Sequence, residues 1–128
     1  MKKTSQRAMT RKLDRLWSEI IKKRAGGRCE RCGAMGPLNA HHIHGRRIFN
    51  TRWSLNNGIA LCHKCHVFGN DSAHQAPLVF AEWLRKEKGQ EWYDDLLRRY
   101  HTVQKVDKEA IYEELKKEKE ILDGGKEV

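Results

Sequence analysis

Long apolar stretches are missing from this chain of 128 residues. It has no run of about 18 apolar residues, so a membrane-spanning helix is not expected. The N-terminus also lacks the apolar stretch of a secretory signal, which favours a cytoplasmic protein. Charged residues make up 34% of the chain and the mean hydropathy is −0.84. We therefore expect one domain with a small core, whose folding a structural metal would help.

Acidic residues are scarce in the first part of the chain. Residues 1–53 contain 14 Lys and Arg against 3 Asp and Glu, whereas residues 54–128 contain 12 against 14. A basic half joined to a near-neutral half is typical of proteins that bind a polyanion such as nucleic acid. Charge alone fits a solvated basic surface equally well, so this interpretation needs a motif to support it.

Cysteine is limited to four residues, arranged as two Cys-x-x-Cys pairs: Cys29 with Cys32, and Cys62 with Cys65. Two such pairs can close a tetrahedral zinc site of four thiolates, which are preferred ligands of structural zinc. Disulfides are the alternative. In a reducing cytosol the paired spacing favours zinc, so we predict one structural Zn²⁺.

The spacing of apolar residues predicts a largely helical chain with two short strands. Its expected parts, in order, are a disordered basic arm (1–9), a helix from Thr10 to the Gly26-Gly27 stop, strands at 38–43 and 58–61 separated by a loop at 45–55, a helix from Cys62, helices at 77–88, 92–100 and 107–123, and a flexible tail (124–128). Residues 10–76 would form the core and residues 77–123 a helical extension. The last helix has a thin apolar stripe, so it either packs lightly or contacts a second copy; we expect a monomer or weak homodimer.

Polar residues that a four-cysteine zinc site cannot use lie between and after the two pairs. His41-His42 comes first, and Asn57 then opens the run Asn57-Gly-Ile-Ala-Leu61-Cys62-His-Lys-Cys65-His66. Over residues 29–74, this ordered set resembles the HNH, or ββα-metal, family of endonucleases. The resemblance implies an α+β fold: a ββα-metal core stapled by the zinc, flanked by an N-terminal helix and two or three C-terminal helices.

The resemblance also implies a function, that of a metal-dependent DNA endonuclease or nickase. By its pattern His41 and His66 would bind a catalytic divalent metal (Mg²⁺, Mn²⁺, Ni²⁺ or Zn²⁺), His42 would be the general base, and Asn57 would orient that base. The residue types suit the chemistry. Neutral imidazole is a good ligand and, with a pKa near 6.5, a good base, while a cation stabilises the charge that develops during phosphodiester hydrolysis.

The third ligand of the catalytic metal has two candidates. Asn70 is four residues after His66, so on a continuous helix the two would share a face. His74 is the stronger ligand type, and Gly69-Asn70-Asp71 could break the helix and let His74 fold back. The run Ser72-Ala73-His74-Gln-Ala-Pro77 also looks like a segment of phage-encoded members of the family, which implies a role in DNA packaging or recombination and possible packaging-protein partners.

Basic and aromatic residues follow the histidine pair. Arg46 and Arg47 are candidates for DNA phosphate contacts, because the guanidinium fork suits phosphate oxygens. Trp53 is expected in the core, and His63 is expected to be a solvated helix residue. Two alternative functions remain open: a non-catalytic zinc module that binds nucleic acid, and a structure-selective, resolvase-type nuclease.

Overall fold

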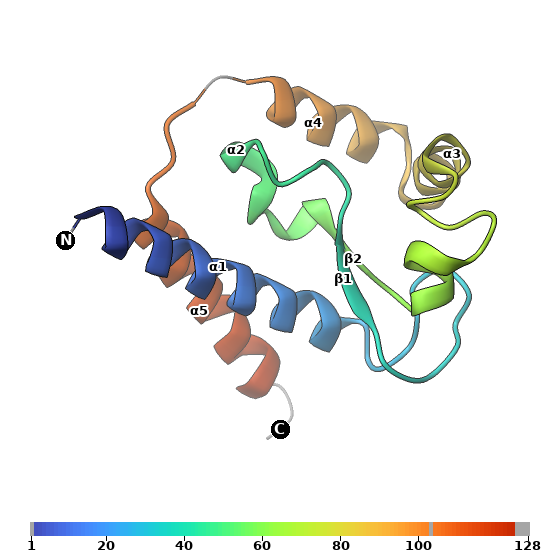
Figure 1. Ribbon diagram of the computed structural model, residues 1–128, viewed down its shortest axis with the longest axis horizontal. Coiled ribbons are helices and arrows are strands. Elements are labelled where there is room, and N and C mark those ends of the chain that lie inside the picture. The colour runs from blue at the N-terminus through green and yellow to red at the C-terminus, as the bar shows by residue number, and fades with distance from the viewer. Residues whose placement is uncertain (1, 103, 125–128) are drawn as a thin grey trace.

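The computed structural model describes residues 2–102 and 104–124, with side chains from Gln6 onward, as a mostly helical α+β fold (Figure 1). Its strands are β1 (Asn39–His42) and β2 (Gly58–Leu61). Its helices are α1 (Lys2–Arg24), α2 (Phe49–Arg52), α3 (Pro77–Lys88), α4 (Gln90–His101) and α5 (Lys108–Gly124), with short helical turns η1 (Leu55–Asn57) and η2 (Lys64–Phe68). The α+β class predicted from the sequence is therefore confirmed. Residues 125–128 of the predicted tail lie outside the described residues.

Helix α1 begins at Lys2, whereas the sequence predicted a disordered arm up to residue 9 and a helix from Thr10. No apolar stripe marks the first stretch, so periodicity could not find it. At the other end, Gly26 and Gly27 adopt φ of 68° and 82°, a left-handed backbone that ends a helix and suits glycine. The buried face of α1 is Leu13, Leu16, Trp17, Ile20 and Ile21.

The two strands form an antiparallel ladder in which His41 lies opposite Ile59 and His42 lies opposite Gly58. Neighbouring residues of a strand point to opposite faces, so the two histidines face different parts of the molecule. Ile59 belongs to a core cluster with Phe80 of α3, whereas Gly58 lies against side chains of α1. His41 therefore faces the α3 side of the sheet and His42 faces the α1 side.

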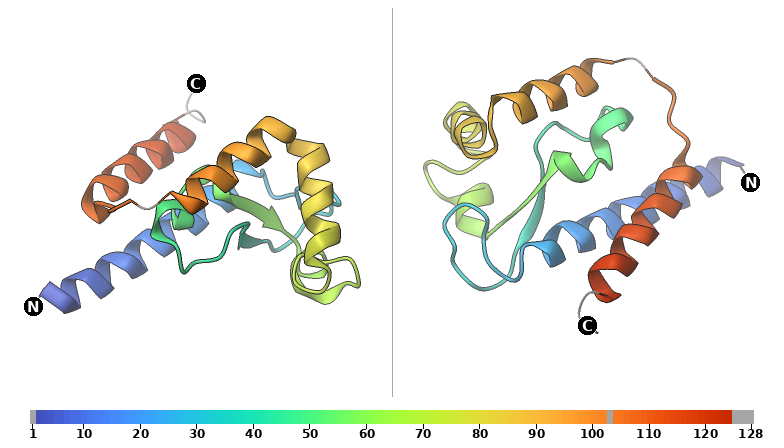
Figure 2. Two further views of the ribbon diagram at one scale, coloured as in Figure 1. Left: turned by 90° about the horizontal axis from the view of Figure 1, so that it is seen from above. Right: turned by 180° about the vertical axis from the view of Figure 1, so that it is seen from behind.

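Helices α3 and α4 lie at an angle to each other on one side of the sheet, and α5 runs beside α1 on the other (Figure 2). Gly89 joins α3 to α4 with φ of 99°, a conformation that glycine adopts readily. An ion pair between Lys23 and Asp123 ties the end of α5 to α1. The apolar stripe of α5 thus packs within the same chain, with Leu115 only 4% exposed.

The segment 45–55 holds more structure than the predicted loop, because it contains the short helix α2. Trp53 is 2% exposed, which confirms its predicted place in the core. The side chain of Asn50 donates to the carbonyl oxygens of Arg99 and Thr102. These bonds attach α2 to the C-terminal end of α4. A helix of one turn is too short to leave a periodic signal in the sequence.

The helix predicted from Cys62 is the five-residue turn η2, in which the N–H of Gly69 donates to the carbonyl of Lys64. It ends at Phe68, because Gly69 is extended. The chain then runs back along the turn, with the N–H groups of Ala73 and His74 bonded to the carbonyls of Cys65 and His66. Among the described residues, no helix combines the length and the apolar character needed to cross a bilayer.

Candidate functional site

Four cysteine sulfurs from two distant segments meet at one point. The Sγ atoms of Cys29, Cys32, Cys62 and Cys65 all lie within 4.8 Å of one another, and none is in a disulfide. The Sγ atoms of Cys32 and Cys62 are 3.7 Å apart. Two sulfurs bound to the same tetrahedral zinc, each at about 2.3 Å, lie about 3.8 Å apart. The cluster could therefore hold a metal ion such as zinc.

Backbone N–H groups surround the first of these sulfurs. The N–H of Arg31 points at the Cys29 Sγ at 3.4 Å, and Gly33, with φ of 80°, closes the turn by donating to the Cys29 carbonyl. Burial raises the pKa of the Cys29 thiol, but N–H groups of Cys32, Cys62 and Arg31 outweigh it and bring the pKa to about 6. This turn is built to hold a thiolate, the form that binds metal.

Glu30, between the first two cysteines, fastens this turn to the sheet. Its N–H donates to the carbonyl of Ala60, and its carboxylate accepts the N–H of Ala60 at 2.7 Å. The first cysteine pair is thus hydrogen-bonded to β2, one residue before Leu61-Cys62. The two pairs are close because β2 binds the first pair through Glu30 and leads directly into the second pair at Cys62.

Three histidines form a second cluster with metal-ligand character. One ring nitrogen from each of His41, His66 and His74 lies within 4.8 Å of the others, and the Nε2 atoms of His66 and His74 are 3.1 Å apart. Nitrogens that share a tetrahedral ion at about 2.1 Å lie about 3.4 Å apart. Burial and the neighbouring histidines lower the pKa of His41 to about 3, so its ring is neutral and able to bind a metal.

Asn39 orients one of these rings. Its Oδ1 lies 3.1 Å from Nδ1 of His66. An amide oxygen only accepts, so Nδ1 of His66 carries the proton and Nε2 is left with its lone pair toward the cluster. Such a partner behind a ligating histidine fixes both the tautomer and the ring direction. Asn39 precedes His41 by two residues on β1 and therefore shares its face.

The structure brings His74, and not Asn70, to this cluster. Asn70 would share a face with His66 only on a continuous helix, and η2 ends at Phe68. The hollow that contains the three histidines does not include Asn70, which lines another hollow beside Cys32 and Lys64. The backward course of residues 69–74, and not helical spacing, is what positions the third histidine.

His42 lies on the other face of β1, stacked on Trp17 of α1. The ring centroids are 3.8 Å apart and the planes differ by 10°. The ring hydrogen-bonds to the backbone of Arg52, and its Nε2 is buried with no partner among the described residues. The bond to Arg52 therefore comes from Nδ1, which must carry the proton to donate to a carbonyl. Nε2 is left as a lone-pair acceptor.

The charge state of His42 agrees with that tautomer. Burial is the main cause that lowers its pKa to about 4, and the cations Arg46 and Arg52 add to the effect. The bond to the Arg52 backbone and the carboxylate of Asp14 act in the opposite direction, but each raises the pKa by less than burial lowers it. The imidazole is therefore neutral at neutral pH and can accept a proton.

Asn57 is fully buried and holds the loop that follows the histidine pair. Its Oδ1 accepts the N–H of His44 at 2.7 Å, and its Nδ2 donates to the carbonyl of His44 at 3.0 Å. The sequence predicted that Asn57 would orient His42. The structure places its amide two residues further on, at His44, so Asn57 fixes the backbone that leaves β1, and no hydrogen bond joins it to the His42 ring among the described residues.

His42 and the three clustered histidines line the same hollow of about 440 Å³. It is lined by Asp14, Trp17, Ser18, Ala40, His41, His42, Gly45, Arg46, His66 and His74. Arg46 and Arg47 are exposed, and only Arg46 lines this hollow. His63, directly before η2, is exposed as predicted and is not part of the histidine cluster.

Asp14 is the one carboxylate in the lining of this hollow, and its charge is already paired. Nη2 of Arg52 lies 2.7 Å from Oδ2, and Nε1 of Trp53 donates to Oδ1 at 2.8 Å. Burial acts to raise the pKa of Asp14, but these bonds outweigh it and hold the pKa below 3.8. Nothing in the sequence pointed to this contact, because Asp14 and Arg52 are far apart in the chain.

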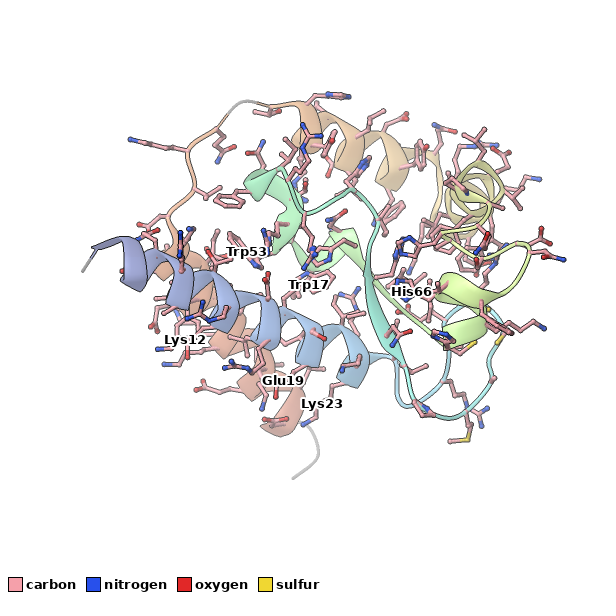
Figure 3. The ribbon with its side chains drawn as sticks, viewed as in Figure 1. Lys12, Trp17, Glu19, Lys23, Trp53 and His66 are labelled. Atoms are coloured by element: carbon pink, nitrogen blue, oxygen red, sulfur yellow. The ribbon has the colours of Figure 1, made fainter. Side chains whose placement is uncertain are left out.

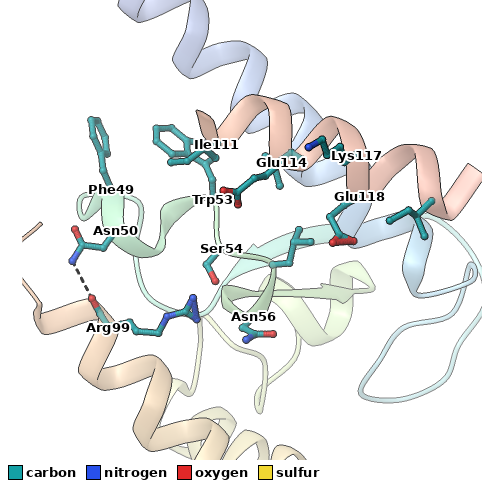
Figure 4. A pocket seen from close by; sticks show the side chains of 13 residues that line it. Phe49, Asn50, Trp53, Ser54, Asn56, Arg99, Ile111, Glu114, Lys117 and Glu118 are labelled. Carbon is teal, nitrogen blue, oxygen red and sulfur yellow. Dashed lines mark hydrogen bonds between the residues drawn. The ribbon is translucent and has the colours of Figure 1, made fainter. Parts of the chain in front are cut away.

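A separate cavity of about 550 Å³ lies between α2, the end of α4 and α5 (Figure 4). Its lining includes Trp53, Arg99, Ile111, Glu114 and Lys117, and it contains no cysteine or histidine. The charges along it are mixed. Its chemistry therefore does not match that of the histidine hollow.

Sequence reasoning missed Trp17 as a site residue, because its helical spacing indicated only core packing. It is indeed 1% exposed, yet one face of the indole contacts His42. Figure 3 shows Trp17 on the side of α1 that faces the strands. Comparison of the chain with protein-family models, with curated proteins and with solved structures found no match.

Proposed function

We propose that the protein is a metal-dependent DNA endonuclease of the HNH type. The observation that carries the proposal is the arrangement around β1. Three histidines converge on one face, and on the other a neutral His42 has an Nε2 without a partner among the described residues. The order of two strands and a helical turn bearing His66 also agrees with the ββα-metal pattern that the sequence resembles.

The chain's own residues would divide the work as follows. Nε2 of His42 would accept the proton of the attacking water, since Nδ1 is held by the Arg52 backbone. His41, His66 and His74 would hold the divalent ion, with Asn39 behind His66. When bound, that ion would supply the positive charge that the scissile phosphate and the leaving 3′ oxygen need.

The cysteine cluster would have no part in the chemistry. It joins the turn before β1 to the start of η2 and so holds the elements that carry the histidines. A four-thiolate site leaves no position open for substrate, which is the mark of a structural zinc. Two metals with separate roles are therefore part of the proposal.

Arg46 and Arg47 would contact DNA phosphates beside the site. Both are exposed and follow the histidine pair by four and five residues, and neither forms an ion pair among the described side chains. The resemblance of residues 72–77 to phage-encoded members of the family extends the proposal to DNA packaging or recombination.

A plasmid-nicking assay tests the proposal. Wild-type protein should convert supercoiled plasmid to nicked or linear forms with Mg²⁺ or Mn²⁺ and not after chelation. His42→Ala should slow cleavage by about 10²- to 10⁴-fold, the usual cost of losing a general base. His101→Ala, an exposed histidine on α4, is the matched control and should cleave at the wild-type rate.

The result separates the candidate functions. A non-catalytic zinc module would bind DNA but cleave no substrate with any of these metals. A resolvase-type nuclease would cleave branched DNA much faster than plasmid, and His42→Ala would still abolish that activity. Full activity in His42→Ala would show that the catalytic assignment is wrong.

A further inference from the structure

A second hollow of about 440 Å³ adjoins the histidine hollow along α1. It is lined by Gln6, Arg7, Thr10, Arg11, Asp14, Phe49, Arg52 and Lys108. Asp14 belongs to both linings, so the two hollows meet at this residue. We refer to the two hollows together as the furrow; Arg7 is in the lining of one of them and the histidines are in the lining of the other.

The spacing of residues on α1 explains the course of the furrow. Arg7, Arg11, Asp14 and Ser18 follow one another at intervals of three or four residues and therefore share one face of the helix. At about 1.5 Å per residue, the stretch from Arg7 to Ser18 extends over roughly 16 Å. The helix thus forms a straight wall from the open end of the furrow to the histidine site.

The charge of the furrow is strongly one-sided. Its two linings contain the cations Arg7, Arg11, Arg46, Arg52 and Lys108. Among the described residues, Asp14 is the one carboxylate in either lining, and Arg52 forms an ion pair with it.

Arg7 and Arg11 have no binding partner among the side chains that the structure describes. Both are exposed, and neither makes an ion pair or a side-chain hydrogen bond among the described residues. Guanidinium groups that are held along a groove without internal partners remain available to phosphate oxygens. The cavity between α4 and α5 differs, because Glu114 and Glu118 there offset Arg99 and Lys117.

We infer that this furrow binds the sugar–phosphate backbone of the DNA strand that enters the histidine site, with Arg7 and Arg11 contacting phosphates remote from the scissile one. The inference rests on the proposed nuclease function for the identity of the polyanion. It assigns to α1 a role in substrate binding besides its place in the core. Arginine contacts to phosphates position a strand without reading its bases, so the furrow gives affinity and register but no sequence preference.

The test compares two double substitutions that remove the same charge. Arg7→Gln with Arg11→Gln removes two furrow cations. Lys12→Gln with Lys117→Gln is the matched control: Lys12 is exposed on α1 but lines neither hollow, and Figure 3 shows it on the side of the helix away from Trp17. Zinc content and thermal melting should match wild type in both, because all four side chains are exposed.

Binding is measured by fluorescence anisotropy on a labelled DNA duplex over a series of salt concentrations, with no Mg²⁺ or Mn²⁺ added. Each phosphate contact contributes a slope of about −0.9 to log K against log salt. The Arg7/Arg11 variant should lower that slope by up to about 1.8 in magnitude, and the Lys12/Lys117 variant should leave it near the wild-type value. Equal effects of the two variants, or no effect of the first, would overturn the inference.

The assay keeps this inference separate from the nuclease proposal. If DNA binding depends on Arg7 and Arg11 but the protein nicks no plasmid, the furrow inference holds and the nuclease proposal fails. If the protein nicks plasmid normally but the slope of log K against log salt is unchanged in the Arg7/Arg11 variant, the nuclease proposal holds and the furrow inference fails.

Discussion

His42 on β1 lies directly opposite Gly58 on β2, and the missing side chain of Gly58 leaves the space that Trp17 occupies. A Cβ at position 58 would lie 2.6 Å from Cζ2 of Trp17 and 2.4 Å from Cδ1 of Ile21. Cross-strand partners point to the same face, so Gly58 is what allows the indole to stack on His42. The candidate base is thus held by a tryptophan from a distant helix and by a glycine that gives it room.

Gly58→Ala should therefore disturb both packing and the candidate base. Overpacking a buried site costs typically about 1–3 kcal/mol, and we expect a loss of this size in the free energy of unfolding. The cleavage rate should fall by more than the loss of folded protein accounts for, because Trp17 must move away from His42. Gly45→Ala is the control for the free energy of unfolding, since a Cβ there meets nothing within 4 Å. Urea unfolding measures the loss of stability and the nicking assay measures the loss of cleavage. An unchanged urea unfolding curve would contradict the predicted contact.

Cys62→Ser should prevent stable folding rather than slow a reaction. A structural zinc can contribute about 10 kcal/mol or more to the folding of a small domain. Removing one of four thiolates should release the metal, which metal analysis of the purified protein would detect. His63→Ala, at the exposed neighbouring position, should keep zinc and fold normally. Folded, chelator-washed wild type without zinc would refute the prediction at its first step.

His74→Ala should raise the Mn²⁺ or Mg²⁺ concentration needed for half-maximal cleavage, whereas Asn70→Ala should change it little. A water can replace one lost ligand, so high metal should partly restore activity. Titration of the metal in the nicking assay measures the difference. The reverse pattern would mean that Asn70 is the ligand. If neither substitution mattered, His41 and His66 would be the only protein ligands of the site.

Arg46→Ala with Arg47→Ala should flatten the dependence of DNA binding on salt. Each lost phosphate contact removes about 0.9 from the slope of log K against log salt, so the change should approach two if both arginines touch phosphate. Arg46 lines the histidine hollow and Arg47 does not, so the single variants distinguish one contact from two. A slope equal to that of wild type would remove both residues from the DNA interface.

Asp14→Asn should destabilise the fold by an amount that stays constant from pH 7 down to about 4.5. Bonds from Arg52 and Trp53 hold the pKa of Asp14 below 3.8, so the carboxylate keeps its charge over this range. A carboxyl group whose pKa is lower in the folded protein than in the unfolded chain stabilises the fold at pH values above its unfolded pKa. It loses that effect as the pH falls from the unfolded pKa through the folded one. Hydrogen bonds to charged groups contribute about 1.5–3 kcal/mol, and partial solvent exposure favours the lower end.

Glu19→Gln provides the comparison for Asp14→Asn, because Glu19 is exposed on the same helix and forms no ion pair among the described side chains. It should leave the free energy of unfolding almost unchanged. Chemical denaturation of all three proteins at several pH values supplies the measurement. A gap between wild type and Asp14→Asn that shrinks already between pH 7 and 5 would show that the pKa of Asp14 is raised instead.

The sequence by itself determined the local parts of the molecule. The two Cys-x-x-Cys pairs predicted a four-cysteine cluster, and alternation and apolar spacing predicted both strands and the helices at 77–88 and 107–123 almost to the residue. These features depend on neighbours within a few positions, so they are visible in the order of residues. The early start of α1 was missed because its first turns have no apolar stripe.

Tertiary structure decided what the histidines contact. The return of the chain after Phe68 brings His74 rather than Asn70 to His41 and His66, and this path depends on backbone bonds between segments. Trp17 reaches His42 only because α1 packs where Gly58 leaves room. Such contacts join residues distant in the chain and are selected by packing. Local sequence patterns therefore do not predict them, and only the fold shows the geometry of the site.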